Sequence, residues 1–368
     1  MKLVIQNGSR VWGGNEKWLA TLASGLIARG HQVVVSCPRG AVRNRLGEMG
    51  IATTPVRPRG ELDAVSGIAF ARWLRRERPD ALLLTSWRPL AWGAWAGRRA
   101  RVPRIAVRLG IVRTFPRRGG RARAFRRWVD AMIVNSTEIR DTWLRSAPGF
   151  PADRVNLVLN GLPARDAERP SLRARLRNEL GIGPETLLIG GAGHLAPRKG
   201  FDLLLRAFAA ADLGDARVVI AGGGDHLAEL VEIAREMGIT ERVHFLGHRG
   251  DGPGVIAGCD LFVVPSRNEG MANVMLEAMA AGVPVIATGI SGVRGALEAE
   301  PGGAPAGWIV PADDAPALAA ALGEVAGGVR GASPTIAQRT GEALRRIHER
   351  FGVERMVREC EDILFGGR

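Results

Sequence analysis

The residues best suited to chemistry lie close together, between Ser266 and Glu277. Two carboxylates, Glu269 and Glu277, are separated by seven residues, and residues 272–281 have the pattern of a helix. Glu277 has apolar neighbours, so its carboxylate needs hydrogen-bond donors, which ribose hydroxyls would supply. Glu269 stands on the preceding loop, within reach of sugar hydroxyls. The structural alternative is a carboxylate that caps the helix and a buried, paired glutamate.

The beginning of that helix adds backbone donors to the two carboxylates. The first amides of a helix have no carbonyl partner within it, and they carry the positive end of its dipole. They can therefore hold a phosphate or a sugar. The residues concerned are Gly270, Met271, Ala272, Asn273 and Val274.

A basic pair on a second loop would complement these groups. Arg198 and Lys199 follow an expected strand at residues 187–191, in a glycine-containing loop that leads into a helix. They suit a diphosphate, because lysine is a compact point charge and arginine a planar fork. The alternative is a solvated basic loop.

A third loop has glycines between a strand and a helix. Residues 3–6 read as a buried strand, and Gly13 and Gly14 precede a helix that starts near Glu16. Glycines there let backbone amides approach an anion. The spacing is not G-x-G-x-x-G, so a dinucleotide site is not indicated. The loop faces either a phosphate or an acceptor, or it is a plain tight turn.

Alternating strands and helices must position these loops. The pattern predicts two doubly wound α/β domains with parallel sheets, whose ligands bind beyond the carboxyl ends of the strands, in the cleft between the domains. We expect domains at residues 1–163 and 164–349, with a final helix at about 350–368 returning to the first domain. The Gly- and Ala-rich residues 325–333 are expected to form a surface loop. In the first half, strands are expected at residues 3–6, 32–36, 81–85, 105–108, 131–135 and 156–159.

Composition narrows the class of protein. The 368 residues are 46% hydrophobic and 24% charged, as in a globular protein, and three cysteines without a motif favour neither disulfides nor a metal cluster. No signal peptide or membrane span is predicted. Residues 1–163 carry 29 Lys and Arg against 10 Asp and Glu, whereas the remainder is mildly acidic. This asymmetry predicts a polyanionic partner for the first domain.

The segment from Ser266 to Glu277 resembles the Glu-x7-Glu motif of the family 4 retaining glycosyltransferases, which have the two-Rossmann GT-B fold. The loop of Gly13, Gly14, Asn15 and Glu16 is also similar. The resemblance implies that Glu277 binds the nucleotide ribose, Glu269 contacts the donor sugar and Lys199 neutralises the leaving diphosphate. It further implies a reaction without a metal or cofactor. Weaker similarities are Asn135-Ser136, Asn160-Gly161 and Phe245-Leu246-Gly247.

Two positions depart from the family pattern. His194 stands where the family usually has an arginine, so either His194 is a weaker phosphate donor or Arg198 replaces it. The family's histidine after the fifth strand is missing, and Arg108 or the Gly110 backbone could take its place. Arg108 and Gly110, together with Asn15 and Glu16, make up the predicted acceptor and sugar side of the site.

The most basic stretch predicts where the polyanion binds. Residues 98–127 contain twelve arginines and no acidic residue, with Trp87, Trp92, Trp95 and Trp128 flanking or among them. Arginines with aromatic residues suit an anionic membrane surface or a phosphorylated lipid. A solvated arginine-rich face is the alternative, and the absence of a nucleic-acid motif disfavours nucleic acid.

Together these features predict a glycosyltransferase that moves a sugar, with retention, from a UDP- or GDP-sugar to an envelope lipid, lipopolysaccharide or polysaccharide. It would be cytoplasmic and peripheral on the inner face of the cytoplasmic membrane. The alternatives are a sugar-nucleotide epimerase on the same fold and a non-catalytic nucleotide-sugar-binding protein.

Overall fold

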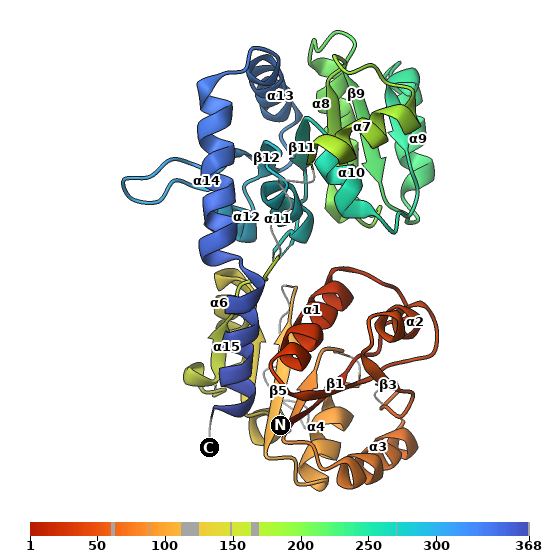
Figure 1. Ribbon diagram of the computed structural model, residues 1–368, viewed down its shortest axis with the longest axis vertical. Coiled ribbons are helices and arrows are strands. Elements are labelled where there is room, and N and C mark those ends of the chain that lie inside the picture. Colours follow the sequence, from red (N-terminus) through yellow and green to blue (C-terminus); the bar gives the residue numbers. More distant parts are fainter. Residues whose placement is uncertain are drawn as a thin grey trace. The chain divides into compact units, whose positions relative to one another are not determined.

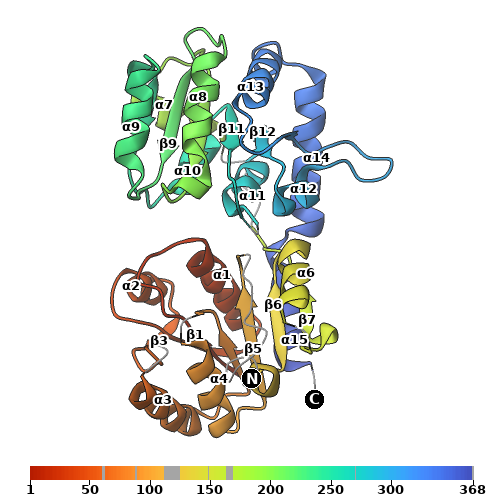
Figure 2. The same ribbon diagram turned by 180° about the vertical axis from the view of Figure 1, so that it is seen from behind.

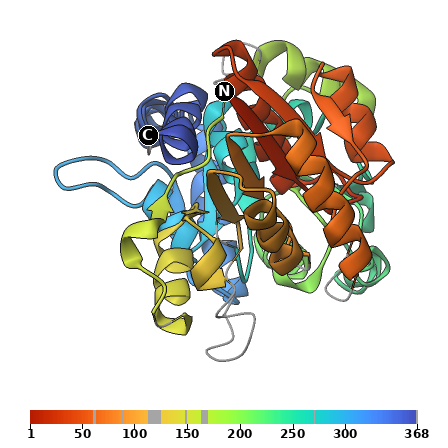
Figure 3. The ribbon, with the colours of Figure 1, turned by 90° about the horizontal axis from the view of Figure 1, so that it is seen from below.

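The computed structural model describes residues 1–59, 63–87, 89–111, 125–147, 149–162, 169–269 and 271–366 (Figure 1). The chain divides into two compact units. Unit 1 contains Met1–Gly161 and Val353–Arg368, and unit 2 contains Leu162–Gly352. The two described ends of the chain both lie on unit 1 (Figure 3).

Unit 1 is built on a seven-stranded parallel sheet with the order β3-β2-β1-β4-β5-β6-β7. The strands are short, and the central ones, β1, β4, β5 and β6, are almost wholly buried, as expected when helices cover both faces. They are β1 (Lys2–Gln6), β2 (Gln32–Ser36), β3 (Ala52–Thr54), β4 (Ala81–Leu84), β5 (Arg104–Leu109), β6 (Ala131–Val134) and β7 (Val155–Leu157). The helices are α1 (Gly14–Ala28), α2 (Ala41–Glu48), α3 (Ala64–Glu77), α4 (Leu90–Arg99), α6 (Thr137–Ser146) and α15 (Val353–Phe365).

Helix α15 completes one face of this sheet although it comes last in the sequence. It packs beside α1, as Figures 1 and 2 show. Gly25 of α1 touches Val357, and any Cβ at Gly25 would overlap that side chain. Met356, Val357, Cys360 and Leu364 belong to the same buried cluster as Leu3 and Ile5 of β1.

Unit 2 repeats the design with six parallel strands in the order β10-β9-β8-β11-β12-β13. Its strands are β8 (Leu188–Ala192), β9 (Arg217–Ala221), β10 (Val243–Phe245), β11 (Leu261–Val264), β12 (Val285–Thr288) and β13 (Trp308–Val310). Its helices are α7 (Arg169–Leu180), α8 (Phe201–Ala210), α9 (Leu227–Glu236), α10 (Gly252–Gly258), α11 (Asn273–Ala280), α12 (Ser291–Leu297), α13 (Ala315–Arg330) and α14 (Pro334–Arg350).

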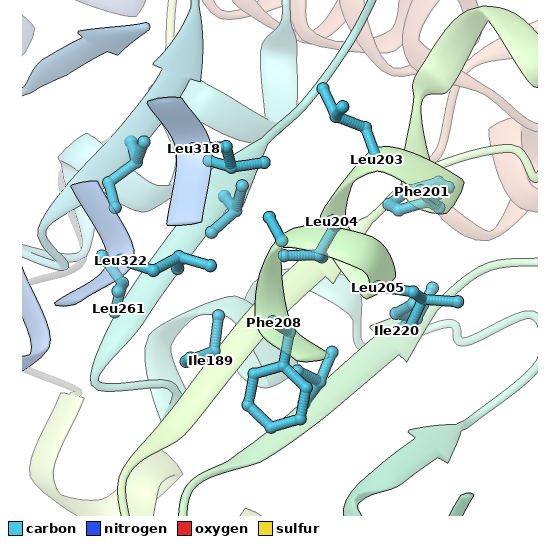
Figure 4. Close-up of a cluster of buried hydrophobic side chains, with 14 of the residues drawn as sticks. Ile189, Phe201, Leu203, Leu204, Leu205, Phe208, Ile220, Leu261, Leu318 and Leu322 are labelled. Atoms are coloured by element: carbon cyan, nitrogen blue, oxygen red, sulfur yellow. The ribbon is translucent and has the colours of Figure 1, made fainter. Parts of the chain in front are cut away.

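The core of unit 2 lies between α8 and the strands beneath it. Phe201, Leu204 and Phe208 recur at helical spacing along α8 and point toward Ile189 and Ile220 of the sheet (Figure 4). Since β8 carries the Lys199 loop at its carboxyl end, this packing holds the start of that loop in place.

The prediction of a loop at residues 325–333 is wrong for its first six residues, which form the end of α13. Glycine lowers helix propensity, but Leu318, Leu322 and Val325 are fully buried along one face of α13. Their burial outweighs that propensity. The short strands β3 and β13 also escaped prediction.

Candidate functional site

Lys199 and Glu269 are brought together although they are 70 residues apart in the sequence. Lys199 ends a short 3-10 helix (Pro197–Lys199) after β8, and Glu269 lies on the loop after β11. Because β8 and β11 are parallel neighbours, both loops leave the same edge of the sheet. The Lys199 ammonium donates to Glu269 Oε1, and Ser266 Oγ donates to the same oxygen at 3.0 Å.

The pair is shielded from water. The side chains of Lys199 and Glu269 are 14% and 7% exposed. Burial, assisted by the positive charge of Arg198, lowers the pKa of Lys199 to about 8. Burial and the neighbouring Arg198 charge favour the neutral amine, whereas the contact with the Glu269 carboxylate favours the ammonium.

Gly200 allows the two loops to meet. Its φ of 67° lies in the left-handed region that side chains disfavour. A Cβ there would also overlap the Pro265 carbonyl oxygen, at the end of β11. The backbone contact between the loops continues as Arg267 N donates to Arg198 O at 2.8 Å.

The second carboxylate, Glu277, lies inside α11 and is 9% exposed. Met271 and Ala272 precede this helix, and Asn273 and Val274 form its first turn. Ala272 takes the N-cap position and has no side-chain oxygen to accept from the first amides. The Ala272 side chain therefore does not cap this helix. Gly270 lies outside the described residues.

The remaining predicted donor-binding residues of unit 2 lie on the Lys199 loop. His194 and Arg198 are both exposed, while Leu195 between them is buried and anchors the loop. Among the described residues, neither side chain forms a hydrogen bond or ion pair with Glu269. Both alternatives, His194 as a weaker phosphate donor and Arg198 as the replacement for the family arginine, therefore stay predictions.

In unit 1 the predicted glycine loop is organised by Glu16. Its carboxylate accepts from Gly13 N at 3.2 Å, Asn7 Nδ2 at 3.0 Å and Asn15 Nδ2 at 3.0 Å. Glu16 thus closes the turn at which α1 begins with Gly14. Asn7, which sequence reasoning missed, supports this turn from the end of β1. Its only signal was a polar residue directly after an apolar strand.

Arg108 joins that turn to the end of β5. Its guanidinium donates to Asn15 Oδ1 and lies 4.2 Å from the centre of the Trp18 ring. A Cβ at Gly110 would approach Arg108 Nη1 to 2.7 Å, so glycine makes room for the guanidinium. Burial lowers the pKa of Arg108 to about 10. All four residues predicted for the acceptor and sugar side are therefore neighbours in unit 1, where Asn15 and Glu16 already bind protein groups.

Within the described ranges, no three His, Cys, Asp or Glu side chains gather so that they could hold a metal ion. Reaction without a metal stays a prediction. The same ranges contain no helix with the length and apolar character that crossing a bilayer requires.

Solved structures share this fold. The Anabaena Alr3699/HepE complex with UDP-glucose aligns with a TM-score of 0.83 at 23% identity, over 99% of this chain and 100% of that one. A glycosyltransferase from Rickettsia africae aligns with a TM-score of 0.84 at 15% identity, over 98% of both chains. The two parallel α/β units therefore have the GT-B fold, as predicted.

Family models match both units. The model described as Glycosyltransferase Family 4 matches residues 12–165, and the model described as Glycosyl transferases group 1 matches residues 185–327. The chain belongs to the family 4, group 1 glycosyltransferases, which confirms the resemblance seen in the sequence.

Curated relatives match over shorter segments. A D-inositol 3-phosphate glycosyltransferase of Mycobacterium sp. (strain KMS) is 40% identical over 171 residues, which is 45% of this chain and 38% of the relative. The lipopolysaccharide core biosynthesis mannosyltransferase LpsB of Rhizobium meliloti is 30% identical over 212 residues, or 55% of this chain and 58% of the relative. The chain thus spans about two fifths of the length of the first of these relatives.

Proposed function

We propose that the protein is a retaining glycosyltransferase that uses a UDP- or GDP-sugar and no metal. The observation that carries the proposal is the buried contact of Lys199 with Glu269, on loops that leave the same edge of the unit 2 sheet as the start of α11. A cation, a carboxylate and helix amides are the groups that a sugar diphosphate requires.

Each group has a separate task in the proposed reaction. Lys199 would turn from Glu269 to the diphosphate, whose charge grows as the bond between the sugar C1 and the phosphate oxygen breaks. Glu269, released from Lys199, would accept hydrogen bonds from sugar hydroxyls, and Glu277 would accept from the ribose. The acceptor oxygen forms a bond to C1 on the face that the diphosphate leaves, and its proton passes to the diphosphate. No separate base is then needed.

Basic residues in unit 1 support an anionic acceptor. Arg10 follows β1, and Arg57 and Arg59 follow β3, so all three leave the carboxyl edge of the sheet. Burial, and then the charges of Arg59 and Arg10, lower the pKa of Arg57. Among the described residues, no ion pair neutralises these arginines. A phosphorylated envelope lipid, lipopolysaccharide or polysaccharide intermediate would supply the missing negative charge, and relatives named for inositol phosphate and lipopolysaccharide core agree with such an acceptor.

Calorimetry with UDP and GDP, followed by transfer assays with their sugars, tests the proposal. Glu277→Ala should weaken binding of the preferred nucleotide at least about tenfold, because the ribose hydroxyls would lose the carboxylate that accepts from them. The control Glu232→Ala, on the exposed face of α9, should bind normally. Retention is checked by the anomeric configuration of the product, and an assay in EDTA checks the metal. If neither nucleotide binds the wild type, the proposal is wrong.

A further inference from the structure

Arg267, in the loop that carries Glu269, forms side-chain hydrogen bonds with three other residues, and the proposed chemistry does not use it. Its guanidinium forms a fork with Asp202, with Nη1 and Nη2 at 2.8 and 2.7 Å from the two carboxylate oxygens. Nη1 also donates to Pro197 O at 2.6 Å, and Nε donates to Asp313 Oδ1 at 2.5 Å.

These partners belong to separate segments of unit 2. Pro197 starts the short helix that ends at Lys199, and Asp202 lies in the first turn of α8. Asp313 follows β13, and Arg267 itself follows β11. One side chain therefore ties the segment on either side of Lys199 to the loop that carries Glu269.

The fork with Asp202 is the strongest of these bonds. The side chains of Arg267 and Asp202 are 30% and 20% exposed, whereas Asp313 is 59% exposed. Burial disfavours the Asp202 carboxylate, but the bonds from Arg267 outweigh it and leave the pKa of Asp202 lowered. Two parallel bonds also fix the angle between the planes of the two groups, which a single bond cannot do.

We propose that Arg267 is a positioning residue that holds the turn carrying Lys199 against the loop carrying Glu269. The inference rests on the proposed function of these two residues in donor binding. Its guanidinium donates to Pro197, Asp202 and Asp313 and, among the described residues, forms no hydrogen bond or ion pair with Lys199 or Glu269, so it acts on the donor through the placement of Lys199.

The burial of Lys199 gives this proposal a direct readout. Without Arg267 the turn loosens and water reaches the ammonium. A solvated lysine titrates at its ordinary value, which lies above the pKa of about 8 that burial gives Lys199, so this pKa should rise.

The test is NMR titration of protein labelled with ¹³C and ¹⁵N in lysine only. The chain has three lysines, Lys2, Lys17 and Lys199, so the spectrum is simple, and Lys199→Arg assigns the signal. In Arg267→Met the pKa of Lys199 should rise by at least about one unit. Asp202→Asn should also raise the pKa of Lys199, and Asp313→Asn should raise it much less.

Arg235→Met is the matched control. Arg235 forms a similar fork with Glu232, but within α9, so its loss should leave the Lys199 titration unchanged. If the pKa of Lys199 in both Arg267→Met and Asp202→Asn equals the wild-type value, the proposal is overturned. If Arg267→Met does not fold, Asp202→Asn decides alone.

UDP binding separates this inference from the proposed function. If Arg267 positions Lys199, UDP affinity should fall at least about tenfold in Arg267→Met, and Arg267→Lys should recover only part of it, because lysine cannot form the fork. If the wild type does not bind UDP or GDP, the proposed function fails, yet the lysine titration still decides whether Arg267 holds Lys199 in place.

Discussion

At the scale of single residues, the sequence identified the reactive groups but not their contacts. Lys199 stood out as part of a basic pair in a glycine-containing loop, and Glu269 as one of a spaced pair of carboxylates. Their contact spans 70 residues, and no local pattern records such a distance. The same holds for Arg108 and Asn15, which meet across 93 residues.

The titration of Lys199 predicts how donor affinity depends on pH. The diphosphate needs the charged amine, and burial has lowered its pKa to about 8 in the free protein. UDP affinity should therefore be constant below that pH and fall about tenfold for each unit above it. Calorimetry from about pH 6.5 to pH 9.5 measures this change.

Lys199→Arg provides the comparison, because a guanidinium stays charged throughout this range. Its UDP affinity should not depend on pH, even if it is lower than that of the wild type. If UDP affinity depends on pH in the same way in both proteins, Lys199 does not bind the diphosphate.

At the scale of elements, alternation of strands and helices was enough to predict two parallel sheets. It failed where elements are short or have unusual composition. β3 and β13 have three residues each and escaped prediction, whereas β7, which is equally short, lies in a longer and mostly apolar segment; α13 contains glycines that tertiary packing tolerates. The loops were harder still, because their shape depends on contacts such as that of Gly200 with Pro265.

Gly200→Ala should separate the two loops. The methyl group would overlap the Pro265 carbonyl, in a backbone conformation that alanine already disfavours. We expect the free energy of unfolding to fall by about 2–3 kcal/mol, with weaker UDP binding. Urea denaturation and calorimetry measure the two effects.

Gly214→Ala is the matched control. Gly214 has a similar φ of 60°, but nothing lies within 4 Å of its Cβ position. Its substitution should cost only about 1 kcal/mol, the strain of the left-handed conformation, and should leave UDP affinity unchanged. Equal losses in both variants would show that the contact with Pro265 is unimportant.

At the scale of the whole molecule, the two units differ more in charge than in fold. Both units are parallel α/β structures, yet the excess of arginine lies in the first. This asymmetry could be predicted directly, because it follows from the numbers of basic and acidic residues in the two parts of the sequence. Much of the basic stretch at residues 98–127 lies outside the described residues, but α3 presents Val65 and Ile68, 79% and 42% exposed, beside the exposed Arg72 and Arg76.

We expect this face of α3 to bind anionic lipid. The protein should float with vesicles that contain phosphatidylglycerol, release them at high salt, and not bind phosphatidylcholine alone. The double substitution Val65→Ser and Ile68→Ser should weaken binding several-fold. Val231→Ser, at a position of unit 2 that is 45% exposed and so comparable to Ile68, should not weaken binding. Salt-independent binding to both kinds of vesicle would contradict this prediction.

The place of α15 in unit 1 has a consequence for the order of events during synthesis. The seven strands of unit 1 leave the ribosome first, but Met356, Val357, Cys360 and Leu364 are translated after the whole of unit 2. Until then the apolar side of α1 and β1 lacks its cover. Unit 2 can thus complete its fold while unit 1 still exposes the apolar surface that α15 later covers, a surface of the kind that chaperones bind.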